Sequence, residues 1–100
     1  MKLGILVNTR RHFPDAVGLT RAAVAKGHEV ILFTMDEGTR LLADAAYTDL
    51  SKLAGVAMSV CEHSAAQYGV RLDGLPKEIV CGSQYQNAVM SQKADRVIVL

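Results

Sequence analysis

The segment VAMSVCEHSAAQYG (residues 56–69) changes character at Cys61. Up to Cys61 the chain is a short, mostly apolar run, which is typical of a strand buried on both faces of a parallel sheet. After Cys61 the residues suit a short helix, and Gly69 provides a helix stop. A strand that passes directly into a helix in this way indicates an α/β fold.

The rest of the chain repeats this alternation of apolar runs and helical segments. Including the segment above, five strands are predicted near residues 2–8, 29–34, 56–61, 78–81 and 95–100. The spacing predicts a helix over Asp15–Lys26, with Pro14 in its first turn and Gly27 as its stop. The stretch 70–77 contains Gly and Pro and is predicted to be a loop.

Three further helix starts can be read from capping residues. Asp36 can cap a helix that runs through Leu41, Leu42 and Ala45, and Thr48–Asp49 can open one that Gly55 stops. Residues Ser83 and Gln86 match a capping box, and the helix after them is expected to carry Tyr85, Ala88 and Val89 on one side.

These elements predict one α/β domain over residues 1–100, with a mainly parallel five-stranded sheet and helices on both of its faces. Half of the residues are hydrophobic, which is enough to build a core. In a parallel sheet the carboxyl ends of all strands lie along one edge, where ligands bind. We therefore expect any site at the ends of the predicted strands.

Composition and missing motifs exclude several classes of function. The net charge of +1 and the five aromatic residues, none of them Trp, give no support to nucleic-acid or membrane binding. The sequence has no G-x-G-x-x-G, no P-loop, no G-x-S-x-G and no metal-ligand spacing, so neither a cofactor nor a metal is expected. Its apolar runs are too short for a signal peptide or a membrane span, and two cysteines make no disulfide framework, so we expect a cytoplasmic protein.

Cys61 is the principal candidate for chemistry. Unpaired amides and the dipole of a helix N-terminus stabilise a thiolate, which lowers the pKa of a cysteine placed there. His63, if protonated, would act in the same direction, Glu62 would act against it, and Ser64 belongs to the same helix start. Packing of a small buried side chain is an equally valid interpretation of Cys61 at this point.

Four other residues are predicted at the same edge. Cys81 ends the fourth strand and could act as a resolving thiol, although simple packing explains it as well. Arg10, Arg11 and His12 follow the first strand and could bind an anionic substrate or partner, although an exposed loop commonly collects such residues.

Three stretches of the chain together resemble a known family. They are GHEVILFTMDEGTRLL (residues 27–42), LSKLAGVAMSVCEHSAAQYGV (residues 50–70) and GSQYQNAVMSQKADRVIVL (residues 82–100), and they are similar to the DsrE/DsrF-like family of small sulfur-relay proteins. The resemblance implies a three-layer αβα domain that assembles into homo- or hetero-oligomers. It also implies that Cys61, which matches the cysteine after the third strand, accepts and donates a persulfide.

Three functions follow from these observations. The first is a sulfur-relay protein, a possible sulfurtransferase, that carries a persulfide on Cys61 between donor and acceptor proteins. The second is a non-enzymatic oligomeric module that binds a small ligand or a protein, with Cys61 only lining the site. The third is a redox function in which Cys61 and Cys81 form a disulfide. Because the last segment, RVIVL, is apolar and must be covered, we also expect a homo-oligomer, a dimer or a trimer.

Overall fold

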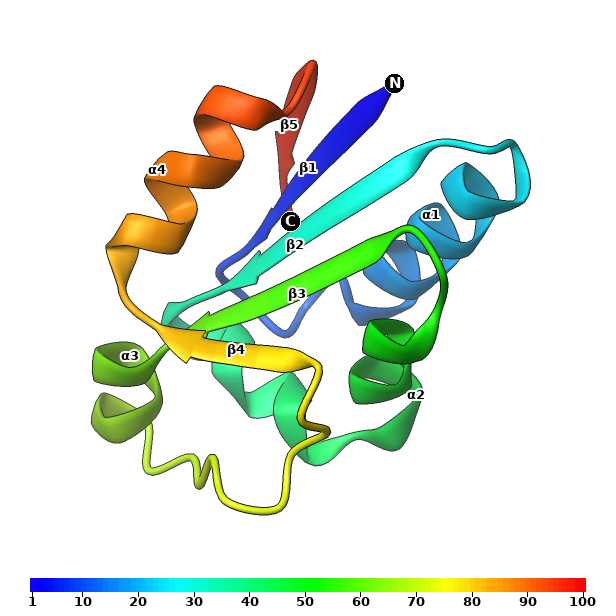
Figure 1. Ribbon diagram of the computed structural model, residues 1–100. Helices are drawn as coiled ribbons and strands as arrows, with labels where there is room; N and C mark the ends of the chain where they lie inside the picture. The colour runs from blue at the N-terminus through cyan, green and yellow to red at the C-terminus, as the bar shows by residue number, and fades with distance from the viewer.

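A five-stranded parallel sheet forms the centre of the computed structural model, which describes residues 1–100 (Figure 1). The strands are β1 (Lys2–Val7), β2 (Glu29–Thr34), β3 (Val56–Cys61), β4 (Ile79–Gly82) and β5 (Arg96–Val99). Their order is β4-β3-β2-β1-β5, and every neighbouring pair is parallel. The predicted parallel sheet is confirmed, and each strand end lies within one residue of its predicted place.

The strand-to-helix passage at Cys61 has the predicted form. Helix α3 (Glu62–Gln67) starts directly after β3, and Cys61 is its N-cap residue. Gly69 has a φ of +66°, which favours glycine, and the next amide, that of Val70, donates to the Ala65 carbonyl at 2.8 Å. This is the pattern of a glycine-terminated helix, and it turns the chain back toward the sheet.

The segment after β2 differs from the prediction. Instead of one helix capped by Asp36, it forms a 3₁₀ helix, η1 (Asp36–Ala43), and a single α-helical turn, α2 (Ala45–Thr48). Asp36 makes no side-chain cap and has a φ of +48°, whereas Asp44 caps α2 by accepting from the Ala46 amide at 2.9 Å. A tighter helix is favoured where Gly38 lies so close to the Val7 carbonyl that no side chain fits between them.

A helix does begin at Asp49 with Thr48 as its N-cap residue, as predicted, although the Thr48 side chain makes no capping hydrogen bond. This helix, η2 (Asp49–Lys52), is one short 3₁₀ turn. Its Leu50 is fully buried in the core. None of the helices is both long and apolar enough to cross a membrane.

Helices cover the two faces of the sheet unequally (Figure 1). Helix α1 (Phe13–Ala25) lies with η1, α2 and η2 on one face, over the larger core cluster. The other face carries α4 (Gln84–Lys93), and a smaller cluster of Phe33, Cys61 and Met90 lies there. The three layers are therefore present, but the layer formed by α4 is thin.

Helix α4 begins at the predicted capping box and packs on the sheet through Met90. The Ser83 side chain and the Gln86 side chain each bond to the other's backbone, as the S-x-x-Q pattern predicts. Met90 is the buried residue of α4, whereas Tyr85 is 69% exposed and Ala88 is also exposed. Tyr85 and Val89, which were predicted to share one side of the helix, line the same groove, whereas the residue that packs against Phe33 is Met90.

Candidate thiol site

Cys61 lies at the carboxyl edge of the sheet, where β3 ends beside β4. It is the last residue of β3, and its partner in the ladder is Gly82 at the end of β4. Its side chain belongs to the face of the sheet that α4 covers, where it packs with Phe33 and Met90. The end of β3, the start of α3 and the start of α4 therefore meet around the sulfur.

A pocket of about 460 Å³ opens onto this junction. Its lining residues are Met35, Asp36, Cys61, His63, Ser64, Gln67, Ser83, Gln84 and Tyr85. Cys61 as a residue is only 3% exposed. The thiol is recessed, and the pocket is its route to solvent.

Polar groups around the Cys61 sulfur outweigh the effect of its burial on the pKa. Burial raises the pKa of Cys61, but the backbone amides of Ser64 and His63 and the side chains of Ser64 and Gln84 lie near the sulfur and favour the thiolate. The net result is a pKa below the ordinary value for cysteine. First-turn amides therefore stabilise the thiolate as the sequence predicts, and the Ser64 hydroxyl adds a further donor.

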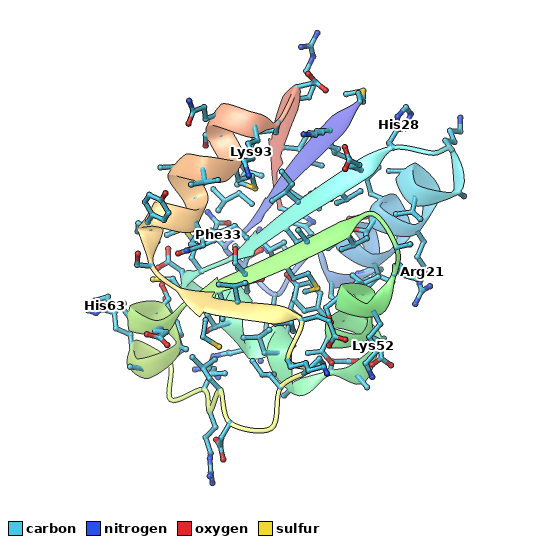
Figure 2. The ribbon with its side chains drawn as sticks, in the orientation of Figure 1. Arg21, His28, Phe33, Lys52, His63 and Lys93 are labelled. Atoms are coloured by element: carbon cyan, nitrogen blue, oxygen red, sulfur yellow. The ribbon has the colours of Figure 1, made fainter.

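His63 acts through its backbone rather than through a charged imidazole. Its side chain is exposed and projects from α3 away from the body of the protein, as Figure 2 shows. The imidazole contributes nothing to the lowered pKa of Cys61, in contrast to the charge effect that the sequence suggested. Glu62 likewise has no part in that shift and instead affects Cys81.

Gln84 is a site residue that the sequence did not indicate. The Gln84 Oε1 accepts a hydrogen bond from Asn87 Nδ2 at 3.2 Å. The Gln84 amide NH₂ therefore faces the sulfurs of Cys61 and Met35, and its Nε2 lies 3.8 Å from Met35 Sδ. Asn87, one turn further along α4, thus holds this amide in a donating orientation. The capping box at Ser83 places Gln84 in the first turn of α4. Knowledge that β4 lies next to β3 would have placed that turn beside Cys61.

Cys81 lies near Cys61 but on the other face of the sheet. In the β3–β4 ladder Cys81 pairs with Val60, one residue before Cys61. Because successive side chains of a strand point to opposite faces, the side chains of Cys81 and Cys61 lie on opposite faces of the sheet. Strand spacings place the two Cα atoms about 6 Å apart, within disulfide range, but their Cβ atoms diverge. The opposite directions of the two side chains argue against an intramolecular Cys61–Cys81 disulfide.

The two thiols also differ in acidity. Cys81 is exposed, and its pKa is raised by partial burial of the sulfur and by the negative charge of Glu62. Because the Cys81 side chain is exposed, packing in the core does not explain it. Because this side chain points to the face of the sheet opposite to that of Cys61, a role as a resolving thiol is not supported either. A raised pKa makes Cys81 the weaker nucleophile of the pair at neutral pH.

The basic loop after β1 is at the same edge but outside the thiol pocket. Arg10, Arg11 and His12 all follow β1, which is separated from β3 by β2. His12 Nδ1 is 3.5 Å from Asp15 Oδ2, and none of the three residues lines the pocket that contains Cys61. Arg10 lines a different cavity, which is described below.

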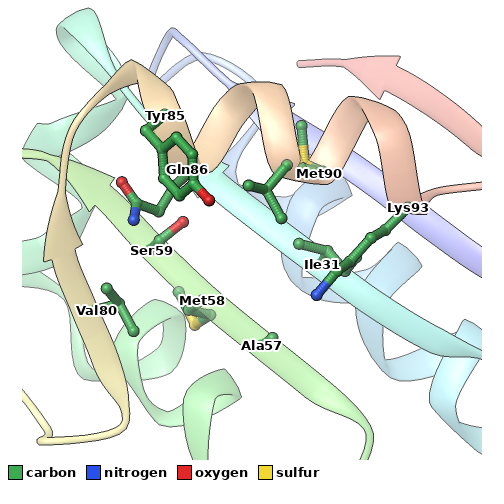
Figure 3. Close-up of a pocket in the computed structure, with 10 residues that line it drawn as sticks. Ile31, Ala57, Met58, Ser59, Val80, Tyr85, Gln86, Met90 and Lys93 are labelled. Carbon is green, nitrogen blue, oxygen red and sulfur yellow. The ribbon is translucent and has the colours of Figure 1, made fainter.

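An apolar groove continues from the thiol pocket along α4 (Figure 3). It has a volume of about 300 Å³ and lies between α4 and the face formed by β2, β3 and β4. Val80, Ser59 and Met90 line it, and Lys93 is at its far end. Tyr85 lines both the groove and the thiol pocket, so the two form one continuous surface. No three His, Cys, Asp or Glu side chains gather anywhere in the chain in a way that could hold a metal ion.

Two solved structures share this architecture. The protein of unknown function MTH1491 from Methanobacterium thermoautotrophicum has a TM-score of 0.76 at 14% sequence identity, over 99% of this chain and 98% of its own. The YchN protein from E. coli has a TM-score of 0.74 at 13% identity, over the full length of both chains. At such low identity these likenesses show the fold alone.

Curated protein sequences show no significant match to this chain. The sequence model of the DsrE/DsrF-like family, in contrast, matches residues 1–100, the entire chain. That match agrees with the parallel five-stranded sheet and with the cysteine at the end of β3. The protein belongs to the DsrE/DsrF-like family.

Proposed function

We propose that this protein is a sulfur carrier in which Cys61 accepts and passes on a persulfide. The observation that supports the proposal best is the set of four donors around the Cys61 sulfur, two backbone amides and the side chains of Ser64 and Gln84. These donors favour the thiolate, which is the form that attacks sulfur. Family membership supports the same chemistry.

The transfer conserves atoms and electrons. The Cys61 thiolate attacks the terminal sulfur of a donor persulfide, R–S–SH, and the new sulfur–sulfur bond replaces the one in the donor. The donor leaves as its thiolate, R–S⁻, and the protein holds Cys61–S–SH. Delivery to an acceptor thiolate is the same exchange in reverse, so no external oxidant or reductant is needed.

The recessed position of Cys61 suits a carrier. The pocket of about 460 Å³ can hold the additional sulfur atom beside the donors of Ser64 and Gln84. Because only 3% of the residue is exposed, a flat protein surface cannot reach the sulfur. The donor and acceptor proteins must therefore present their sulfur on a protruding segment. The proposal places the carrier in a reducing cytoplasm, where its two free cysteines remain reduced.

Mass spectrometry tests the proposal directly. The reduced protein is incubated with a small persulfide donor, and the product is digested after the free thiols have been blocked. We expect the mass of one sulfur atom to be added on Cys61 and to be absent from the Cys61→Ser variant. Cys81→Ser is the matched control and should load as the wild type does. Loading that follows Cys81, or that persists without Cys61, would exclude the carrier function.

We further propose a homo-oligomer in which a second copy covers the thin side of the sheet. Large apolar side chains remain exposed around α4, among them Val80 at 53%, Tyr85 at 69% and Val99 at 59%. Exposed apolar surface of this kind marks an interaction site. Since Tyr85 also borders the thiol pocket, a copy bound in the groove would form part of the wall around Cys61. Sedimentation as a 10.8 kDa species at micromolar concentration would rule out this assembly.

This same surface supports the second candidate, a non-enzymatic oligomeric binding module. In that case the groove of about 300 Å³ takes a small ligand or a protein segment, and Cys61 only lines the neighbouring pocket. The mass-spectrometry experiment separates the two, because a binding module gains no sulfur.

A further inference from the structure

A second polar cavity, of about 400 Å³, lies beyond the C-terminal end of α3 and away from Cys61. Three segments that are distant in the sequence form it: the loop after β1, the helix η1 and the loop after α3. Its lining residues are Arg10, Arg40, Leu42, Ala43, Tyr68, Gly69, Val70 and Arg71. Three of the six arginines in the chain meet here, and no Asp or Glu lines the cavity.

The local fold holds two of these arginines in place. The guanidinium carbon of Arg40 lies 5.7 Å from the centre of the Tyr68 ring, in a cation–π contact that restricts its side chain. Gly69 turns the chain after Tyr68, and Arg71 is oriented by Asp73, with Nε to Oδ1 at 3.0 Å and Nη2 to Oδ2 at 2.7 Å. Arg40 and Arg71 both line the cavity, Arg71 with a side chain that is 84% exposed.

Most of this positive charge is not neutralised by the protein. The ion pairs of the molecule are His12–Asp15, Lys52–Asp49 and Arg71–Asp73, so no carboxylate lies within 4.0 Å of the guanidinium of Arg10 or of Arg40. Glu37 accepts from the backbone amide of Arg10 at 3.2 Å rather than from its side chain.

Asp73 reduces the charge of Arg71 only. The hydrogen bond from Arg71 holds the pKa of Asp73 below its usual range, so Asp73 is a carboxylate at neutral pH. It occupies one edge of the guanidinium, and the remaining N–H groups of Arg71 are free. Arg10 and Arg40 are therefore the two arginines of the cavity without a carboxylate partner.

We propose that this arginine cavity binds a small anion that carries phosphate. Guanidinium groups match phosphate oxygens in charge and in fork geometry, and the cavity volume is in the range of small-ligand sites. The arginines converge on one recess instead of following a stripe, and the chain has a net charge of only +1, which argues against a nucleic-acid backbone. The site is independent of the thiol chemistry proposed above.

Titration calorimetry on the full chain tests the proposal. The probes are pyrophosphate, which represents a free phosphate anion, and phenyl phosphate, which represents an ester, each measured against sodium chloride at equal ionic strength. The variants are Arg10→Gln and Arg40→Gln, and Arg21→Gln on α1 is the matched control that removes the same charge elsewhere (Figure 2). All three arginines are exposed, so the fold should be retained.

We expect saturable binding of at least one probe by the wild type. Loss of either cavity arginine should weaken it about tenfold or more, because a charge-assisted hydrogen bond is lost, while Arg21→Gln should bind as the wild type does. Binding of pyrophosphate alone indicates a free anion, and binding of phenyl phosphate indicates an ester. Heats that do not saturate with either probe, or an equal loss in all three variants, would overturn the proposal.

Discussion

Removal of the Ser64 hydroxyl is the sharpest test of how the protein activates Cys61. The substitution Ser64→Ala deletes the side-chain donor to the sulfur but leaves the backbone amides of Ser64 and His63 and the side chain of Gln84. Alanine is also favourable in a helix, so α3 should be retained. The variant therefore isolates one of the four donors.

The size of the effect follows from the nature of this hydrogen bond. A hydrogen bond to a charged group contributes about 1.5–3 kcal/mol, and we take about 1 kcal/mol because the pocket is open to water and sulfur is a weak acceptor. That energy corresponds to an about fivefold loss of thiolate relative to thiol at a pH below the pKa. The pKa of Cys61 therefore rises toward its ordinary value.

Nucleophilicity compensates for part of this loss. A more basic thiolate is a better nucleophile, with a Brønsted coefficient of about 0.4–0.5, so the alkylation rate should fall only about 2.5-fold at low pH. At high pH, where both proteins are fully ionised, the same coefficient makes the variant react about twofold faster than the parent. The two pH–rate profiles should cross, and this crossing is the signature of a lost donor.

The assay is alkylation of Cys61 with iodoacetamide in a Cys81→Ser background, followed from acid to alkaline pH. Ser91→Ala, on the exposed side of α4, is the matched control and should leave the profile unchanged. Thermal denaturation of each variant checks that the fold is intact. An identical profile for Ser64→Ala, or a rate that is lower by the same factor at every pH, would refute the proposed role of the hydroxyl.

Three further predictions concern other parts of the molecule. Glu62→Gln should lower the pH midpoint for alkylation of Cys81, because the negative charge that raises its pKa is removed; an unchanged midpoint in a Cys61→Ser background would contradict this. Tyr47→Phe should destabilise the protein by about 1–2 kcal/mol in urea denaturation, because Thr34 Oγ1 loses its 2.6 Å partner in a fully buried position. Val80→Lys should shift sedimentation toward the monomer if a second copy covers the groove, and an unchanged assembly would place the interface elsewhere.

The chain order of elements and the position of the Cys61 thiol could be predicted from the sequence. Apolar runs, glycine stops and the capping box at Ser83 are local patterns, and local patterns determine where strands and helices begin and end. The placement of Cys61 at a strand end and a helix start is local as well, since both elements are consecutive in the chain. For this reason the parallel sheet and the thiol edge were both predicted correctly.

The surroundings of that thiol depend on contacts between distant segments. Strand β4 lies next to β3, which brings Gln84 to the sulfur of Cys61, and the register places Cys81 on the opposite face. A shift of one residue in that register would reverse the two faces, and nothing in either strand alone determines it. The burial of Met90 rather than Tyr85 was likewise decided by packing against Phe33.

The arginine cavity shows the same division between sequence and structure. Arg10 was identified as part of a basic loop, but Arg40 and Arg71 are separated from it by some 30 and 61 positions in the numbering. They meet because η1 packs against α3 and because Gly69 turns the chain after that helix. The sequence by itself therefore determined the elements and the thiol, whereas tertiary packing decided the partners of each charged and polar group, because such partners are set by distances in space rather than along the chain.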